Sequence, residues 1–147
     1  MLTKLLNDNR IKKVKSVNTY FDAINLACEP LLLDNSISNK YIENIFKTID
    51  KYGPYFILSD NFAIPHSYDF NGVIEDSMSL LVVEDGVDFL GKNVNVFLVI
   101  ASKDVKSHLE NLQLMASYFY EKDIIKNLII SDENKFIDIL SNFETTL

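Results

Sequence analysis

Two long apolar runs constrain the fold of this chain more than any other feature of its sequence. Residues 78–83 (Met-Ser-Leu-Leu-Val-Val) and 94–101 (Val-Asn-Val-Phe-Leu-Val-Ile-Ala) are rich in β-branched side chains and lack clean alternation of apolar and polar positions. Such runs are typical of strands that are covered on both faces. We therefore expect two buried strands, separated by turns in the stretch 84–93.

Amphipathic helical patterns surround these two strands. The first begins near Thr19 and contains Pro30, which should kink or divide the helix. The second follows Ser38 and should end at Gly53. A third, over residues 104–121, turns apolar side chains toward the core, Leu109 among them. We also expect helices over 123–130 and 132–143, an edge strand over 11–17, and short strands over 55–58 and 62–64. Strands and helices intermixed in this way indicate an α/β protein with helices over one sheet.

The composition of the chain excludes several classes of function. Its 147 residues suit one domain, and we expect residues 1–147 to form it. The formal net charge is −7 and the basic residues form no stripe, which argues against binding to nucleic acid. Cys28 is the only cysteine, so the chain has no internal disulfide, and we expect a buried, inert thiol. No apolar stretch approaches the roughly 20 residues that span a bilayer, and the N-terminus is not a secretory signal, so we expect a cytoplasmic protein.

The two histidines are the candidate functional residues. His66 follows Pro65, which fixes the backbone just before the imidazole, and His108 lies at the start of the helix expected over 104–121. We expect no metal, because a catalytic zinc site needs about three protein ligands and no zinc-binding spacing is present. We expect no cofactor either, because the chain has no glycine-rich phosphate loop, and it has no motif of a catalytic triad. Phosphoryl transfer through a neutral imidazole remains, against the alternatives of a solvated or core-capping His66 and a solvated His108.

Several segments carry a resemblance to a known family. They are residues 53–58 (Gly-Pro-Tyr-Phe-Ile-Leu), 62–66 (Phe-Ala-Ile-Pro-His), 72–73 (Gly-Val), 79–82 (Ser-Leu-Leu-Val), 87–89 (Val-Asp-Phe), and 94–101 leading into 104–109. In order and spacing they resemble the enzyme IIA domains of the mannitol–fructose class in the bacterial sugar phosphotransferase system. The run 52–56 (Tyr-Gly-Pro-Tyr-Phe) is most similar to the ascorbate branch of that class. The resemblance implies an α/β fold in which a mixed β-sheet of about five strands has helices packed on both faces.

The resemblance also implies a function as a phosphoryl carrier in sugar uptake. His66 matches the family's phosphorylated histidine, which would accept the phosphoryl group from the phosphocarrier protein HPr and pass it to a cysteine of a cognate enzyme IIB. The membrane component, enzyme IIC, would be served only indirectly. His108 matches the second active-site histidine, in a supporting, phosphate-stabilising role. The alternative from another class is a regulatory module whose phosphorylation state controls a protein partner.

One residue of the family pattern is absent from this chain. Mannitol-type members carry an arginine upstream of the phosphorylated histidine, whereas residues 46–51 contain none and Asp50 falls at about that position. This departure favours the ascorbate-like branch. The charge of the phosphoryl group would then have to be met by other donors, such as His108 and backbone amides. The only arginine, Arg10, lies near the N-terminus and receives no role.

Overall fold

A mixed five-stranded sheet forms the centre of the molecule. The computed structural model describes residues 5–120 and 122–144. Its elements are η1 (Asp8–Arg10), β1 (Ile11–Val14), α2 (Tyr20–Leu33), α3 (Asn39–Tyr52), β2 (Ile57–Ser59), β3 (Asn61–Ala63), β4 (Ser77–Phe89), β5 (Lys92–Ala101), α4 (Val105–Tyr118), α5 (Lys122–Ile130), η2 (Glu133–Lys135) and α6 (Phe136–Glu144). The strand order is β1-β4-β5-β3-β2, with β1 at one edge, as its lysines predict. The pairs β4–β5 and β2–β3 are antiparallel, whereas β1 pairs parallel with β4 and β3 pairs parallel with β5.

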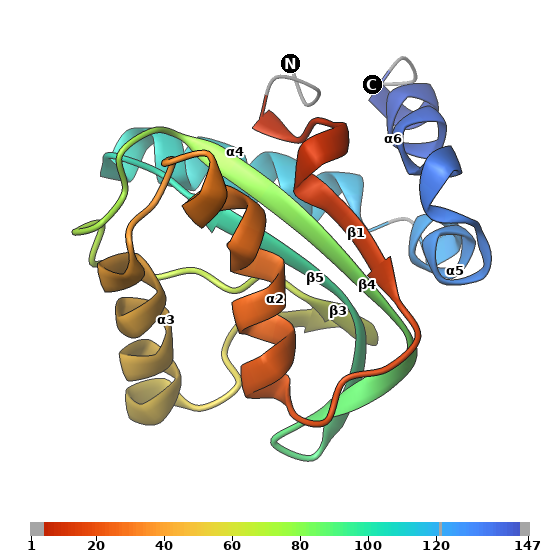
Figure 1. Ribbon diagram of the computed structural model, residues 1–147, viewed down its shortest axis with the longest axis horizontal. Helices are drawn as coiled ribbons and strands as arrows, with labels where there is room; N and C mark the ends of the chain where they lie inside the picture. The colour runs from red at the N-terminus through yellow and green to blue at the C-terminus, as the bar shows by residue number, and fades with distance from the viewer. Residues whose placement is uncertain (1–4, 121, 145–147) are drawn as a thin grey trace.

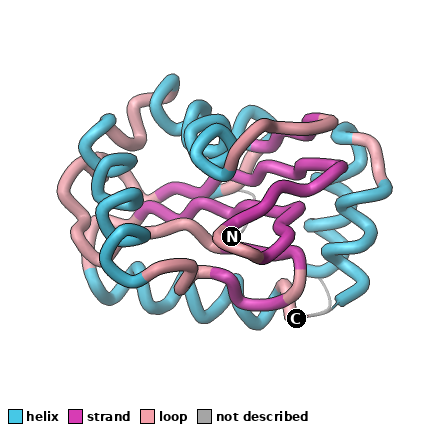
Figure 2. Tube along the Cα trace, turned by 90° about the horizontal axis from the view of Figure 1, so that it is seen from below, coloured by secondary structure: helices cyan, strands magenta, loops and turns pink. Residues whose placement is uncertain are grey.

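Helices cover both faces of this sheet, which confirms the expected fold class. Figure 1 shows α2 and α3 on one face and α4, α5 and α6 on the other. In Figure 2 the strands run between the helices. Successive residues of β4 alternate between the two cores: Leu81 and Val83 pack with α2 and α3, whereas Leu80 and Val82 pack with α4 and the C-terminal helices. The apolar runs are therefore buried strands, as predicted. No helix in the described part of the chain is both long enough and apolar enough to span a membrane.

The stretch 84–93 is mostly strand rather than turn, so that prediction is wrong. β4 continues to Phe89 and pairs with β5 through a hairpin whose turn is Leu90-Gly91, both with positive φ. The polar residues that suggested turns fall where the strand register shifts, between Val82 and Val87. Beyond that irregularity Val87 and Phe89 return to the core, and this burial keeps the strand paired.

The ends of α2 and α3 follow the sequence signals. The Thr19 side chain accepts a hydrogen bond from the backbone N–H of Asp22 and caps α2. α2 then runs unbroken to its end, so Pro30 does not divide it. Pro30 lies in the last turn, where only the carbonyl group of Leu26 loses its helical partner. α3 ends at Gly53, as predicted. The φ of Gly53, +75°, is positive and favours glycine, but its ψ of −152° lies outside the left-handed helical region that was expected.

The face that α4 presents to the core differs from the prediction. Asp104 caps the helix, because its side chain accepts a hydrogen bond of 2.8 Å from the N–H of Ser107. Met115 is buried as predicted, but Leu109 is 50% exposed and its neighbour His108 is buried in its place. The rotation of this helix about its axis therefore places an imidazole, rather than the neighbouring leucine, in the interior of the protein.

Candidate functional site

The candidate site is centred on His66, in the loop that follows β3. Its Nδ1 lies 2.6 Å from the carbonyl oxygen of Ile64, and a carbonyl oxygen only accepts, so Nδ1 carries the proton and donates it. This bond leaves the lone pair of Nε2 free. Burial lowers the pKa of His66 to about 4, whereas the bond to Ile64 opposes this shift and the nearby His108 adds to it. At neutral pH the ring is therefore an uncharged imidazole with one nucleophilic nitrogen.

Two tyrosine hydroxyls hold the backbone around His66. The hydroxyl of Tyr41 on α3 donates to the carbonyl group of Ile100 on β5, at 2.6 Å, and accepts from the N–H of Ser67, at 3.1 Å. The hydroxyl of Tyr55 donates to the carbonyl oxygen of His66 itself, at 2.6 Å. Burial raises the pKa of both phenols, so neither loses its proton near neutral pH. The loop is thus fixed at the reactive residue and directly after it.

A chain of hydroxyl groups ties the same loop to α3. Thr48 donates its hydroxyl hydrogen to the carbonyl group of Asn44, at 2.7 Å. The Ser67 hydroxyl lies 3.1 Å from that of Thr48 and accepts from the N–H of Asp69. Because the hydrogen of Thr48 is already used, Ser67 donates to Thr48. Ser67 is therefore a structural residue of the loop, with no hydroxyl hydrogen left for a ligand.

The second predicted residue, His108, lies beside the first. The centroids of the His66 and His108 rings are 5.1 Å apart, so the structure brings the two predicted site residues together. His108 is only 1% exposed, and within the described residues neither of its ring nitrogens has a hydrogen-bond partner. Burial lowers its pKa as well. The alternative of a solvated His108 is wrong, and a buried imidazole with two unpaired nitrogens is instead ready to meet a polar group brought to His66.

Aromatic side chains surround the two histidines, and the sequence patterns described above do not indicate them. The rings in contact are Tyr55, Phe56 and Tyr68 around His66, and Tyr68 and Phe70 around His108. Among the aromatic rings of the described residues, only that of Tyr68 contacts both imidazoles. The sequence does contain a signal for these contacts, because aromatic residues stand both before and after His66. Residues close in sequence to a loop histidine can readily pack against its ring.

A cavity of about 730 Å³ opens beside the loop. Its walls include Lys47 and Lys51 of α3, one helical turn apart, together with Tyr68. Neither lysine forms an ion pair with another described residue. Arg10 is occupied elsewhere, by Asp34 at 2.9 Å, and so contributes no charge to this cavity. α3 thus contributes positive charge to this cavity, which Asp69 also lines.

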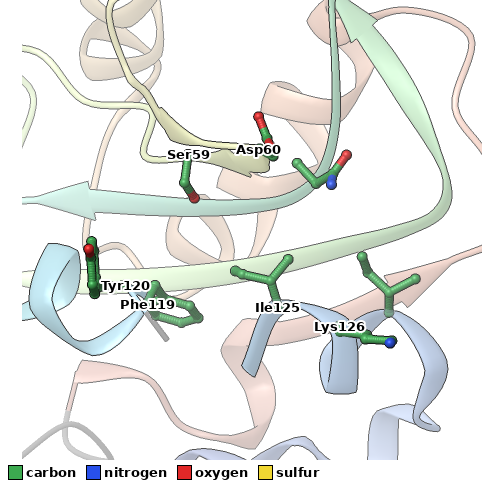
Figure 3. Close-up of a pocket in the computed structure, with 8 residues that line it drawn as sticks. Ser59, Asp60, Phe119, Tyr120, Ile125 and Lys126 are labelled. Carbon is green, nitrogen blue, oxygen red and sulfur yellow. The ribbon is translucent and has the colours of Figure 1, made fainter. Parts of the chain in front are cut away.

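A second cavity, of about 540 Å³, lies between the β2–β3 turn and the helices α4 and α5, as Figure 3 shows. Ser59 and Asp60 face Phe119 and Ile125 across it, and no histidine lines it. Unlike the first cavity, it contains no residue of the loop around His66, so it is separate from the candidate site. In the described residues no three His, Cys, Asp or Glu side chains are grouped closely enough to hold a metal ion. Burial raises the pKa of the Cys28 thiol to about 12, which makes it the inert core cysteine that was expected.

Comparisons with known proteins identify the family of this chain. The family described as "Phosphoenolpyruvate-dependent sugar phosphotransferase system, EIIA 2" matches residues 4–143. The mannitol-specific cryptic phosphotransferase enzyme IIA component of Escherichia coli (strain K12) is 31% identical over 143 residues, covering 95% of this chain and 97% of the relative. The ascorbate-specific EIIA component of Mycoplasma pneumoniae is 25% identical over 128 residues, covering 85% and 80%.

The solved structures give the same answer. The solution structure of the mannitol-specific cryptic enzyme IIA from Escherichia coli superimposes with a TM-score of 0.87, at 28% identity, over 96% of this chain and 98% of that one. Proteins of this class are phosphotransfer components of sugar phosphotransferase systems. The chain therefore belongs to the EIIA type-2 family of the phosphoenolpyruvate-dependent sugar phosphotransferase system.

Proposed function

We propose that this protein accepts a phosphoryl group from phospho-HPr on Nε2 of His66 and passes it to the cysteine of a cognate enzyme IIB. The observation that carries the proposal is the bond from Nδ1 to the Ile64 carbonyl, which leaves Nε2 as the one nitrogen with a free lone pair. A depressed pKa keeps that lone pair unprotonated at the pH of the cytoplasm, where we expect the protein to act.

The transfer needs no cofactor. The Nε2 lone pair forms a bond to phosphorus while the bond between phosphorus and the donor breaks, and the proton on Nδ1 stays on its hydrogen bond to Ile64. In the second step a thiolate of enzyme IIB attacks phosphorus and the electron pair of the P–N bond returns to Nε2. The phosphoryl group carries about −1.5 to −2 charges at neutral pH. Such an anion favours the protonated form of the adjacent His108, which would then donate a hydrogen bond to a phosphoryl oxygen.

An exposed apolar strip next to the site supports the use of protein partners. Val105 and Leu109 lie one turn apart on α4 and flank the buried His108. Val105 is 58% exposed and Leu109 is 50% exposed. Apolar side chains held out of the core beside a reactive group suit docking of another protein. A solved complex of the mannitol enzyme IIA of Escherichia coli with phosphorylated enzyme IIB has the same fold, at 15% identity and a TM-score of 0.77. By analogy we assign the strip to a IIB partner.

The sugar is proposed at a coarser level. The absence of an arginine from residues 46–51 favours an ascorbate-like substrate, and the relatives include both ascorbate-specific and mannitol-specific components. Enzyme IIC would carry the sugar across the membrane, so this chain would contact it only through enzyme IIB. A panel of IIB partners therefore tests the sugar: fastest transfer to a mannitol-type IIB would contradict the ascorbate-like assignment.

The proposal is tested by reconstitution with enzyme I, HPr and labelled phosphoenolpyruvate. The wild-type chain should become labelled, His66→Ala should not, and a labelled His66→Ala variant would refute the assignment. His108→Ala should accept the label but transfer it to IIB poorly, and a wild-type transfer rate would remove His108 from the reaction. Labelling without onward transfer to any IIB would favour the regulatory alternative.

A further inference from the structure

The space around His108 is too enclosed for the reaction proposed for the two histidines. His66 is 4% exposed and His108 is 1% exposed, and both nitrogens of His108 are out of contact with solvent. In-line phosphoryl transfer needs phosphorus within about 3–3.5 Å of Nε2, with room for three oxygens around it. Those oxygens would occupy the space next to His108. Part of the site must therefore move before a phosphoryl group can enter.

Tyr68 is the side chain placed to make that movement. Its ring stands edge-on to His66, with centroids 5.5 Å apart at 83°, and edge-on to His108, at 5.0 Å and 74°. It is nevertheless 57% exposed, and its hydroxyl makes no hydrogen bond to any described residue. The other rings are held more firmly or reach less far: Tyr55 is tied to the backbone of His66, and Phe70 touches only His108.

The surroundings of Tyr68 allow the side chain to turn without moving the loop. The backbone on either side is anchored, because the N–H of Ser67 donates to Tyr41 and the N–H of Asp69 donates to the hydroxyl of Ser67. Tyr68 itself lines the cavity of about 730 Å³ beside the site, a volume that accommodates a ligand much larger than one phenol ring. The cavity therefore has room for the rotated side chain of Tyr68.

We propose that Tyr68 is a movable cover over the His66–His108 pair, and that its rotation into the neighbouring cavity admits the phosphoryl group between the two imidazoles. The inference rests on the proposed function for its purpose, but the cover itself is a property of the unmodified protein. Rotation would also open the histidines toward the cavity that Lys47 and Lys51 line. Their unpaired charges would attract the phosphoryl dianion in a chain whose net charge is −7. Tyr68 is thus a positioning residue that controls access to the space between the two imidazoles.

Modification with diethyl pyrocarbonate tests the cover without any phosphotransferase partner. An uncharged imidazole nitrogen attacks one carbonyl carbon of the reagent, and the ring becomes carbethoxylated with release of ethanol and carbon dioxide. At pH 8 both histidines are neutral in every variant, so the rate reports access. Mass spectrometry of the peptides that contain His66 and His108 follows each ring separately.

Removal of the ring should expose both histidines. Tyr68→Ala should be modified on the order of tenfold faster at His108 and His66, because two edge-on aromatic contacts hold the cover closed. Tyr68→Phe, which keeps the ring, should react like wild type. The matched control is Tyr52→Ala, because Tyr52 is an exposed ring of the same cavity that touches neither histidine. Equal rates for wild type and Tyr68→Ala would overturn the proposal, and so would an equal acceleration in the control.

The cover and the proposed function can fail separately. If phospho-HPr does not label the wild-type chain, the phosphoryl-carrier function is refuted while the modification rates still judge the cover. If wild type is labelled but Tyr68→Ala shows no faster modification, the carrier stands and the cover is refuted. The substitution is at an exposed position, and an unchanged thermal midpoint will verify that the variant is folded.

Discussion

Acid should destabilise this protein through His66 in particular. The usual pKa of histidine is 6.5, and burial lowers it to about 4 in the folded protein. Between these values the unfolded chain binds more protons than the folded one, so stability rises with pH in this window. The contribution is complete above pH 6.5 and is lost as the pH falls toward 4.

The size of the effect follows from the shift. A difference of about 2.5 pKa units corresponds to roughly 3 kcal/mol, of which roughly 2.5 kcal/mol is lost by pH 4.5. His66→Asn isolates this contribution, because the asparagine amide nitrogen reaches the position of Nδ1 and can still donate to the carbonyl group of Ile64. Other groups that titrate in acid, such as Asp34 and Asp104, are present in both proteins and cancel in the comparison.

Urea unfolding at pH 7.5 and pH 4.5 measures the difference. The chain has no tryptophan, so far-UV circular dichroism is the suitable signal. Wild type should lose about 2.5 kcal/mol more unfolding free energy between the two pH values than His66→Asn does. If both proteins lose the same free energy to within about 0.5 kcal/mol, the buried, neutral state assigned to His66 is wrong.

Three further substitutions probe the scaffold of the site. Tyr41→Phe should lower the free energy of unfolding by about 2–4 kcal/mol, measured by thermal or urea unfolding, because it leaves two buried backbone groups unpaired. Tyr52→Phe, at an exposed position, should be neutral, and equal effects of the two substitutions would contradict the bonding described. Gly72→Ala should destabilise by at least about 2 kcal/mol more than Gly91→Ala, because both have a φ of +97° but only at Gly72 would the new Cβ clash with a backbone nitrogen, that of Tyr41. Comparable urea midpoints would count against this. Asp104→Ala should lower the free energy of unfolding by about 1 kcal/mol through loss of the cap on α4. Asp104→Asn and Asp104→Ser should keep most of that free energy, and a loss as large as that of Asp104→Ala in both variants would contradict a capping role.

The sequence predicted those parts of the fold that depend on local chemistry. The cap at Thr19, the end of α3 at Gly53 and the doubly covered strands each follow from a few adjacent residues. The sequence underpredicts the length of β4, because Glu84 and Gly86 are residue types typical of turns. Burial of Phe89 in the core keeps the strand paired with β5 beyond them. The composition of a short segment carries no information about contacts with residues that are distant in the sequence.

The candidate site, too, could be predicted from the sequence only in part. His66 and His108 could be selected from the sequence because their residue type and flanking motifs carry the chemistry. Their mutual distance and the burial of His108 could not, since the rotation of α4 is decided by packing against the sheet. The role of Tyr41 was also hidden, because its hydroxyl joins segments that are far apart in the sequence.

The mixed pairing of the sheet has a consequence for the order of folding. β4 and β5 are joined by a two-residue turn, so their pairing closes a short loop and costs little chain entropy. The parallel neighbours β1 and β3 must be brought to this hairpin from a long way along the chain. We expect the hairpin to form first and to act as the template for the rest. The loop of His66, which is held by contacts from β5 and α3, would then acquire its shape only when folding is nearly complete, so that chemical reactivity is among the last properties the chain gains.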